Sequence, residues 1–341
     1  MSSDRLGEQE KTIYQELRSM LKARQEQKQL EAEQQKKPSV DPDEDTDDTQ
    51  NLVYSIPVDH EGTAVFVKGW AKANSEYPPL VIVHDLGENI ALYRTAARRL
   101  GEEGFSVFGF DLRGHGRSGR LLGHIPHFDS LVNDLLQVVA WIRFKSNRRV
   151  PLIVGQGLGA LITVYFQKAY PQMVDGSVLV APVLDHKLRL TLVHRLLVRG
   201  MAEVLPRSRL PRSLVPRFVT RAPAVEGMVE KTYHGITANF AKELINAVMR
   251  VGDHFKQFET PSLIIAPETE QGYDFENLFQ MIAQHPHAAQ FHPMPLAGIG
   301  LQPLTADEAQ LETVMKVMLP WLKTHFAKEN AQKAESLPKG L

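Results

Sequence analysis

Hydrophobic positions divide the chain into a polar N-terminal part and a longer part in which apolar runs alternate with helical patterns. In residues 1–37 the regular apolar positions form one narrow stripe, Ile13, Leu17, Met20, Leu21 and Leu30, which is too thin for a core. This pattern favours a solvated polar helix, with a short coiled-coil or docking helix as the alternative. Residues 38–50 contain two prolines and six acidic residues, as is typical of a disordered linker. We therefore expect a folded domain from residue 51.

From residue 51 the pattern predicts strands that alternate with helices. Two β-rich runs, 52–58 and 64–70, are separated by the turn sequence Asp59–Gly62 and predict a hairpin. Further apolar runs predict strands at 80–83, 105–110, 151–155, 176–183, 262–265 and 289–294. Helical patterns predict helices at about 90–103, 129–145, 160–169 and 306–327, followed by a polar tail over 328–341. This alternation indicates an α/β fold with a mostly parallel sheet between helical layers.

A long insert, about 184–256, separates the strand at 176–183 from the strand at 262–265. Residues 187–221 contain nine Lys or Arg residues and one acidic residue, Glu203. Leucines interleave there with Arg189, Arg195 and Arg199. A helical cap with snorkelling arginines is one interpretation, and a surface for anionic lipid is another. The acidic linker of the same chain is a third partner for this basic segment.

Composition limits the class of protein. The chain has 341 residues, of which 43% are hydrophobic and 23% charged, as expected for a soluble globular protein with one sizeable α/β domain. A net charge of −1 gives no reason to expect nucleic-acid binding. The absence of cysteine excludes disulfides and thiol catalysis. The polar N-terminus and the lack of a long apolar run predict a cytoplasmic protein, with peripheral membrane contact left open.

The segment Gly155–Gly159 carries the main clue to chemistry. It follows a buried-type strand and opens a helix, the arrangement of a nucleophile elbow, Gly-x-Ser-x-Gly. The central position is Gly157, which has no side chain to acylate. Glycine also relieves the backbone strain that a side chain suffers at this turn. The spacing differs from that of a dinucleotide-binding loop, so nucleotide binding is not expected.

Four segments in order resemble a known family. They are His84–Glu88, Asp111–Gly119, Gly155–Gly159, and Tyr170–Pro171 with the strand that ends at Pro182. Asp111–Gly119 has the pattern Asp-x-Arg-Gly-His-Gly-x-Ser-Gly, which is the most specific of the four. Together they are similar to the lysophospholipase and monoacylglycerol lipase branch of the α/β-hydrolase fold, the serine aminopeptidase S33 type. The resemblance implies an α/β-hydrolase domain over 51–327, with the insert at the position of the family's lid.

The resemblance also implies where a catalytic triad would lie. The nucleophile position is Gly157, the acid position is Glu270 or, as second choice, Asp274, and the base position is Ile299. No histidine occurs between Pro293 and Thr324, so a small shift of the alignment supplies no base. The triad is therefore degenerate, and no catalytic residue is assigned.

Two backbone N–H groups, of Leu86 and Leu158, take the family's oxyanion-hole positions and are the candidate ligand-binding groups. Asp85 replaces a family glycine in the first loop and is expected to alter the turn that places the Leu86 N–H group. The two N–H groups are thus expected to remain as hydrogen-bond donors for a carbonyl or carboxylate oxygen, although the acyl-transfer reaction that they normally assist is absent.

The histidines favour structural roles. The pairs His124/His127 and His285/His287 lack a carboxylate at metal-ligand spacing and are interpreted as loop residues. His84 and His115 match family positions in turns, where buried rings satisfy polar groups. No metal site and no cofactor are expected.

These observations predict a non-catalytic α/β-hydrolase homologue that binds an apolar acyl-type ligand or a protein partner. One alternative is an active carboxylic-ester or lipid hydrolase with a rearranged site. The other is a scaffolding protein whose pocket is filled by its own side chains. The partners expected are an apolar small molecule or lipid, and an anionic membrane surface through Arg189, Arg195 and Arg199.

Overall fold

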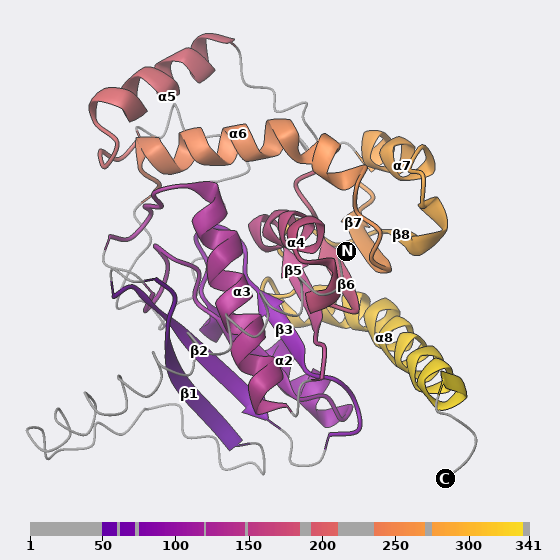
Figure 1. Cartoon of the computed structure of the whole chain (residues 1–341). Coiled ribbons are helices and arrows are strands. Elements are labelled where there is room, and N and C mark those ends of the chain that lie inside the picture. The colour runs from indigo at the N-terminus through magenta and orange to yellow at the C-terminus, as the bar shows by residue number, and fades with distance from the viewer. Residues whose placement is uncertain are drawn as a thin grey trace, which may run out of the picture.

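A mostly parallel sheet runs through the domain in the strand order β1-β2-β4-β3-β5-β6-β7-β8 (Figure 1). The computed structural model describes residues 50–59, 62–71, 75–118, 121–146, 149–184, 192–210, 235–269 and 275–336. The strands are β1 (Gln50–Pro57), β2 (Ala64–Ala71), β3 (Leu80–Val83), β4 (Val107–Phe110), β5 (Leu152–Gln156), β6 (Gly176–Val180), β7 (Ser262–Pro267) and β8 (Phe291–Leu296). β1 and β2 form the expected antiparallel hairpin, β2 pairs antiparallel with β4, and the remaining pairs are parallel.

The central strands are apolar because both of their faces are covered. Every residue of β3, β5 and β6 is buried, and Val, Ile and Leu dominate these strands, as buried parallel strands require. α3 (Phe128–Lys145), α4 (Leu158–Ala169) and α6 (Ala238–Phe255) pack into one apolar cluster. α2 (Arg94–Glu102) and α8 (Glu308–Ser336) pack into a second cluster on the other face. The expected helical layers on both faces are therefore present.

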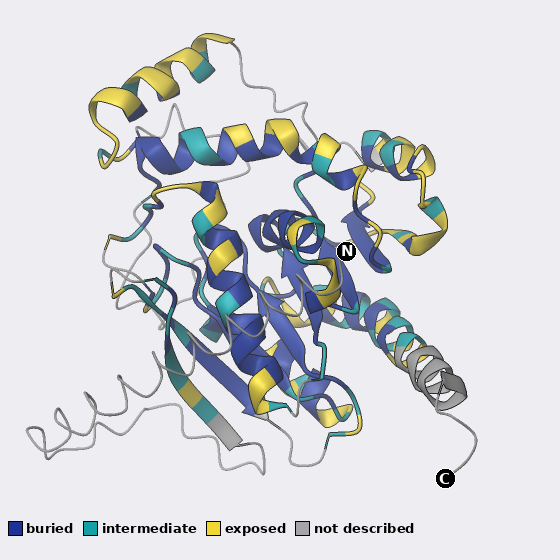
Figure 2. Ribbon diagram, viewed as in Figure 1, coloured by how far each residue is buried: buried dark blue, intermediate teal, exposed yellow. Residues whose placement is uncertain are grey.

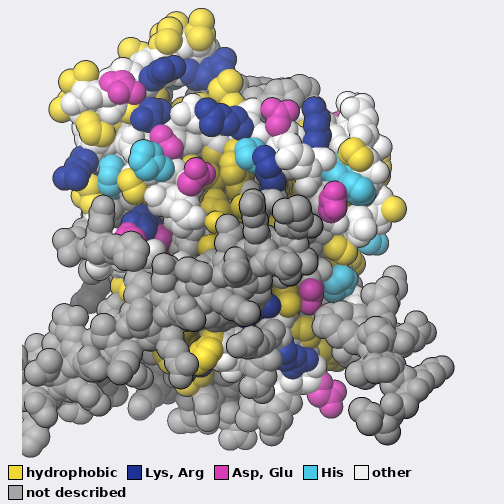
Figure 3. Space-filling model, in the orientation of Figure 1, with side chains coloured by type: hydrophobic (Ala, Val, Ile, Leu, Met, Phe, Trp, Pro, Cys, Tyr) yellow, Lys and Arg dark blue, Asp and Glu magenta, His cyan; other side chains and the backbone are white. Residues whose placement is uncertain are grey.

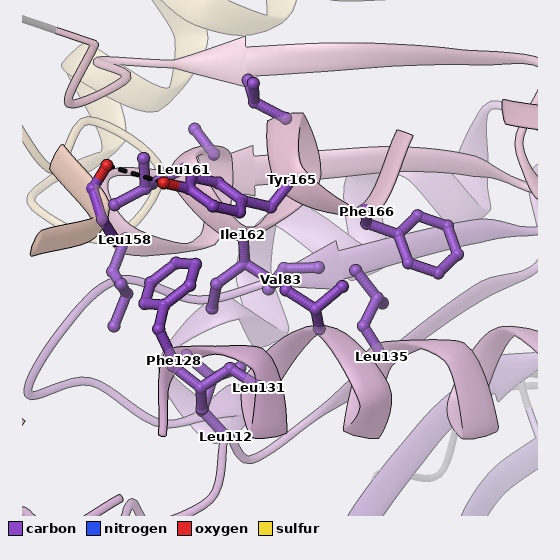
Figure 4. Packing of buried hydrophobic residues seen from close by; sticks show 14 of the residues in the cluster. Val83, Leu112, Phe128, Leu131, Leu135, Leu158, Leu161, Ile162, Tyr165 and Phe166 are labelled. Atoms are coloured by element: carbon purple, nitrogen blue, oxygen red, sulfur yellow. Dashed lines mark hydrogen bonds between the residues drawn. The ribbon is translucent and has the colours of Figure 1, made fainter. Parts of the chain in front are cut away.

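Aromatic and aliphatic side chains join α3 to α4. Phe128 and Leu131 of α3 face Ile162 and Tyr165 of α4 (Figure 4), and the rings of Phe128 and Tyr165 lie 4.8 Å apart. The Tyr165 hydroxyl donates a hydrogen bond to the Ala247 carbonyl of α6, at 2.8 Å. α4, the helix that starts at the elbow, is thus held by the sheet, α3 and α6.

The observed elements differ from the predicted ones mainly at their ends. The predicted helix at 90–103 is a 3-10 turn, η1 (Ile90–Tyr93), followed by α2. The closing helix α8 continues to Ser336, although residues from 328 onward were predicted to be a tail. Residues 327–336 are rich in Ala, Lys, Glu and Gln, which are strong helix formers, so the helix has no reason to stop at 327. The short elements η2 (Pro171–Met173), α7 (Phe275–Ala283) and η5 (Ala288–Gln290) had no counterpart in the sequence prediction.

The insert between β6 and β7 contributes two long helices among its described residues. α5 (Leu192–Val204) packs on α6, and α6 lies between α5 and the body of the domain (Figure 1). Most of the α5 surface is exposed, whereas one side of α6 is buried (Figure 2). No helix in the described ranges is both long and apolar enough to cross a membrane. The predicted N-terminal helix, residues 38–49 of the acidic linker and Arg189 lie outside the described residues, and Gln50, the last residue of the predicted linker, is the first residue of β1.

Candidate functional site

The turn between β5 and α4 has the strand–turn–helix form of an elbow, with glycine at the position that the resemblance gives to the nucleophile. β5 ends at Gln156, Gly157 has φ 53° and ψ −111°, and α4 starts at Leu158. This φ is a left-handed conformation that strains residues with a side chain. A Cβ atom at Gly159 would lie 2.0 Å from the Val83 carbonyl oxygen, so the crossing of α4 over β3 also needs glycine there. The turn is therefore fixed by backbone packing.

The Asp85 carboxylate occupies the space beside Gly157. Its Oδ1 accepts hydrogen bonds from the N–H groups of Leu86 and Leu158, each at 2.7 Å. Its Oδ2 accepts one from Nε2 of Gln302, at 3.1 Å. A Cβ atom built on Gly157 would meet Asp85 Oδ1 at 2.1 Å. The two N–H groups that the family resemblance assigns to the oxyanion hole thus converge on one oxygen of the chain itself.

A second buried carboxylate, Glu88, lies behind Asp85. Its Oε2 accepts hydrogen bonds from the Asp85 N–H at 2.9 Å and from the Tyr93 hydroxyl. Its Oε1 accepts one from the Thr305 hydroxyl at 2.7 Å, and Nε2 of Gln156 lies 3.3 Å from both oxygens. Among the described residues neither Asp85 nor Glu88 forms an ion pair. Hydrogen bonds alone satisfy both carboxylates.

Burial dominates the electrostatics of this pair. Loss of water raises the pKa of Asp85 to about 6, against the opposing effect of the two N–H donors. Burial and the neighbouring Asp85 charge raise the pKa of Glu88 to about 7. Burial and the charges of Glu88 and Asp85 raise the pKa of Tyr93 well above its ordinary value. The hydroxyl therefore stays protonated and donates a hydrogen bond to Glu88.

The position that the resemblance gives to the catalytic base is apolar. Ile299 follows β8, is 5% exposed, and belongs to the apolar cluster on the α2 and α8 face. His292 lies in β8 and is exposed, with its ring near Trp321. His325 also packs on Trp321, and its Nε2 lies 3.2 Å from the Asp175 carbonyl oxygen. Asp175 precedes β6, so this contact lies at the amino end of a parallel strand, whereas the elbow lies at the carboxyl end of β5. The acid candidates Glu270 and Asp274 lie outside the described residues.

The described part of the Asp-x-Arg-Gly-His-Gly-x-Ser-Gly segment, residues 111–118, forms a turn after β4 that contacts neighbouring elements. Asp111 accepts hydrogen bonds from the N–H groups of Ile90 and Arg117. Arg113 pairs with the fully buried Asp134 of α3, at 2.7 Å, and with Asp59 of the hairpin turn, at 2.9 Å. These contacts join the loop after β4 to two other elements.

The histidines near the site have structural contacts. His84 donates from Nδ1 to the Asp85 carbonyl at 2.7 Å and accepts the Leu112 N–H at Nε2. Burial holds the pKa of His84 well below its ordinary value, so the ring is neutral. His124 bonds to the Thr237 hydroxyl and His285 to the Phe255 carbonyl. No group of three or more metal-ligating side chains occurs in the part of the chain that the structure describes.

Residues 78–290 match the family model described as serine aminopeptidase, S33. The chain belongs to this family. It is an α/β-hydrolase of the lysophospholipase and monoglyceride lipase type, as the resemblance predicted. Similar sequences include a probable lysophospholipase L2 of Haemophilus influenzae, 24% identical over 61% of this chain and 73% of the relative. A monoglyceride lipase homolog of Monkeypox virus is 25% identical over 63% of this chain and 77% of the relative.

An uncharacterized abhydrolase domain-containing protein of Dictyostelium discoideum is 23% identical over 58% of this chain, and the match spans 21% of that protein. Among solved structures, a soluble variant of monoglyceride lipase from Saccharomyces cerevisiae has a TM-score of 0.67 at 15% identity, over 84% of this chain and 99% of that one. The monoacylglycerol lipase of Paleococcus ferrophilus has a TM-score of 0.63 at 19% identity, over 76% of this chain and 99% of that one. These likenesses support the α/β-hydrolase fold.

Sequence reasoning singled out Gly157, Leu158, Leu86 and Ile299 but did not predict what fills the space beside Gly157, between the Leu86 and Leu158 N–H groups. The Asp85 side chain was expected only to disturb its own turn, whereas it binds both N–H groups. Gln156, Gln302 and Thr305 were not singled out at all. A polar residue in place of a family glycine, directly before an oxyanion-hole position, was the signal available in the sequence.

Proposed function

We propose that this S33-family protein is a non-catalytic homologue that acts by binding and does not turn over an ester. The observation that carries the proposal is the residue at the elbow. Acyl transfer on this fold needs a nucleophilic oxygen and a base to take its proton. Gly157 supplies no oxygen, and Ile299, at the base position, supplies no proton acceptor.

Serine-directed chemistry tests this proposal directly. The purified full-length protein should not react with a fluorophosphonate probe and should not hydrolyse p-nitrophenyl esters of short or long acyl chains above background. Gly157→Ser alone should stay inactive, since no base is restored. Probe labelling of the wild-type protein, with ester turnover that a site variant abolishes, would overturn the proposal.

An active enzyme with a rearranged site remains the second candidate, and one contact favours it. The Thr305 hydroxyl donates to Glu88 at 2.7 Å, which places a hydroxyl beside a carboxylate whose pKa is raised to about 7. If the wild-type protein did turn over esters, Thr305→Val and Glu88→Gln should abolish the activity. Thr313→Val, which alters an exposed hydroxyl on α8, is the matched control.

For the partner, we propose an anionic membrane surface that contacts α5. Large aliphatic side chains on the outer side of this helix are exposed, from 50% for Leu197 to 77% for Val204. The others are Leu192, Val193 and Leu196. Figure 3 shows hydrophobic side chains over the α5 region at the top of the view, with Lys and Arg side chains beside them. Arg199 is exposed beside this apolar strip, whereas Arg195 is half-buried and its Nη1 lies 3.3 Å from Met249 Sδ of α6. An apolar strip with an exposed cation beside it suits an interfacial helix.

Vesicle co-sedimentation tests the membrane proposal. The full-length protein should bind vesicles that contain phosphatidylserine, and binding should fall at high salt. Arg199→Glu should weaken binding, whereas Lys316→Glu, the same charge change on the exposed surface of α8, should not. Binding that appears only when residues 1–49 are removed would mean that the acidic linker occupies the basic surface. No binding by either form at low salt would contradict the proposal.

A further inference from the structure

We propose that the Leu86 and Leu158 N–H groups form a retained carboxylate-binding site that the protein fills with its own Asp85 side chain. Asp85 then acts as an internal ligand that keeps acyl groups out of the former catalytic centre. The inference rests on the proposed function, because a working hydrolase needs the same two donors for the oxygen of its substrate.

The donors come from two separate elements and meet at one oxygen. Leu86 follows β3, and Leu158 is the first residue of α4. Both N–H groups lie 2.7 Å from Asp85 Oδ1, a distance expected for charge-assisted hydrogen bonds. Backbone donors cannot rotate away as side chains can, so their direction is set by the fold. Gln302 Nε2, at 3.1 Å, completes the set by binding the second oxygen.

Asp85 also blocks the site by its volume. The carboxylate lies 2.1 Å from where a Gly157 Cβ atom would be, so it fills the place of the nucleophile as well as that of the substrate oxygen. The residue is only 9% exposed. No acyl oxygen can reach the two N–H groups while Asp85 holds them, because Oδ1 takes both donors.

The loop after β8 holds this arrangement closed. Gln302 binds Asp85, Thr305 binds Glu88, and the Leu304 N–H donates to the Gln156 side-chain oxygen at 3.0 Å. The loop that carries a catalytic histidine in the resemblance thus carries contacts to the β3 loop and to the elbow. The contacts join all three loops around the carboxylate.

The surroundings select the class of ligand that would replace Asp85. Three N–H donors satisfy one planar monoanion, and no cation pairs with Asp85 among the described residues. Glu88 lies next to the site, since it accepts the Asp85 N–H, and its negative charge opposes a dianion. The site therefore fits a small monocarboxylate or the carboxylate end of an acyl chain and disfavours phosphate.

Chemical rescue tests the inference on the full-length protein. Asp85→Ala removes the internal ligand and leaves two buried N–H groups without an acceptor, which lowers Tm. Sodium formate or acetate should then raise Tm saturably by roughly 2–4 °C relative to sodium chloride at equal ionic strength. Sodium phosphate should not. In protein labelled with 15N-leucine, formate should shift the amide resonances of Leu86 and Leu158.

Three control proteins distinguish formate binding at this site from a general effect of formate on stability. The wild-type protein and Asp85→Asn, which both fill the site, should show no specific formate effect. Leu161→Ala, a buried apolar truncation, should lose stability without rescue. If Asp85→Ala does not fold, Asp85→Gly, the residue of the family pattern, takes its place. Equal formate effects on the open variant and on these controls would overturn the inference. That result would leave the absence of ester turnover, and so the proposed function, intact.

Discussion

At the scale of single residues, Gly157 and Asp85 are complementary. The glycine has no side chain, and the aspartate extends into the space that a side chain at 157 would take. A side chain at position 157 and the Asp85 side chain in its observed place exclude one another, because the new Cβ atom would lie 2.1 Å from Asp85 Oδ1. Substitutions at the two positions should therefore not be additive.

Gly157→Ser should destabilise the protein by about 1–3 kcal/mol or more, because the new Cβ has a left-handed φ and collides with Asp85. Urea unfolding measures the loss. Asp85→Gly combined with Gly157→Ser should cost less than the sum of the two single changes. Gly200→Ser on α5, where a Cβ meets nothing within 4 Å, is the control and should be close to neutral. Equal losses at 157 and 200 would contradict the fit described between Asp85 and Gly157.

The two buried carboxylates predict an unusual pH dependence. Their pKa values are about 6 and about 7 in the folded protein against 3.8 and 4.5 for the ordinary groups. The native state therefore holds protons that the unfolded chain has already released. Their contribution to the free energy of unfolding is present at low pH and is lost as the pH rises through 6 and 7.

Urea unfolding of the wild type, Asp85→Asn and Glu88→Gln between pH 5 and 8 measures this effect. The wild type should gain roughly 1–3 kcal/mol relative to either variant as the pH falls from 8 to 5, at about 1.4 kcal/mol per pKa unit. The difference between proteins isolates these groups from Asp111 and Asp134, whose pKa values are also raised to about 6. A pH profile shared by all three proteins would show that the pair does not titrate in this range.

At the scale of elements, two sets of ion pairs that differ in burial join separate parts of the domain: one holds the turn after β4, and the other joins α2 to α8. Arg113 is 13% exposed and pairs with Asp134, whose side chain is fully buried in α3. Arg99 of α2 pairs with Glu308 and Glu312 of α8, whose side chains are 78% and 47% exposed. Solvent screens the second group of contacts but not the first.

Arg113→Ala should therefore cost about 3–5 kcal/mol, because it leaves the Asp134 charge buried without a partner. Arg99→Ala should cost about 0–1 kcal/mol. Thermal unfolding of both variants at pH 7.5 compares the two contacts between elements. A small loss for Arg113→Ala would show that the loop can rearrange to hydrate Asp134.

The types and order of the elements could be predicted from sequence because burial leaves periodic patterns. β3 is an unbroken apolar run and β5 begins as one, because both faces of these strands are covered. Helix ends were harder, as α8 shows, because its last residues are polar helix formers whose continuation depends on propensity alone. The Asp85 network was hidden for another reason. Its members are spread from residue 85 to residue 305, and only the sheet order brings them together.

At the scale of the whole molecule, the domain from β1 to α8 has apolar clusters on both faces of its sheet. Residues 1–49 are expected to be separable from it, because the acidic run 41–48 repels itself and contributes no apolar surface. Limited proteolysis should cut between about Pro38 and Gln50. A protein starting at residue 50 should keep Tm within a few degrees of the full chain. A large fall in Tm would place the N-terminal segment in the fold.

The glycines at 155, 157 and 159 bear on how such chains are recognised. Gly155 and Gly159 are required by the close approach of β3, β5 and α4, whether or not a reaction takes place beside them. Selection for stability alone would therefore preserve the two flanking glycines of a Gly-x-Ser-x-Gly signature even in a protein that does not hydrolyse esters. Only the central residue of the signature and the histidine after the last strand would then distinguish such a chain from an active one. A genome survey that identifies lipases by these glycines alone would therefore include inactive family members. Checking the central residue and the histidine together would separate active from inactive sequences.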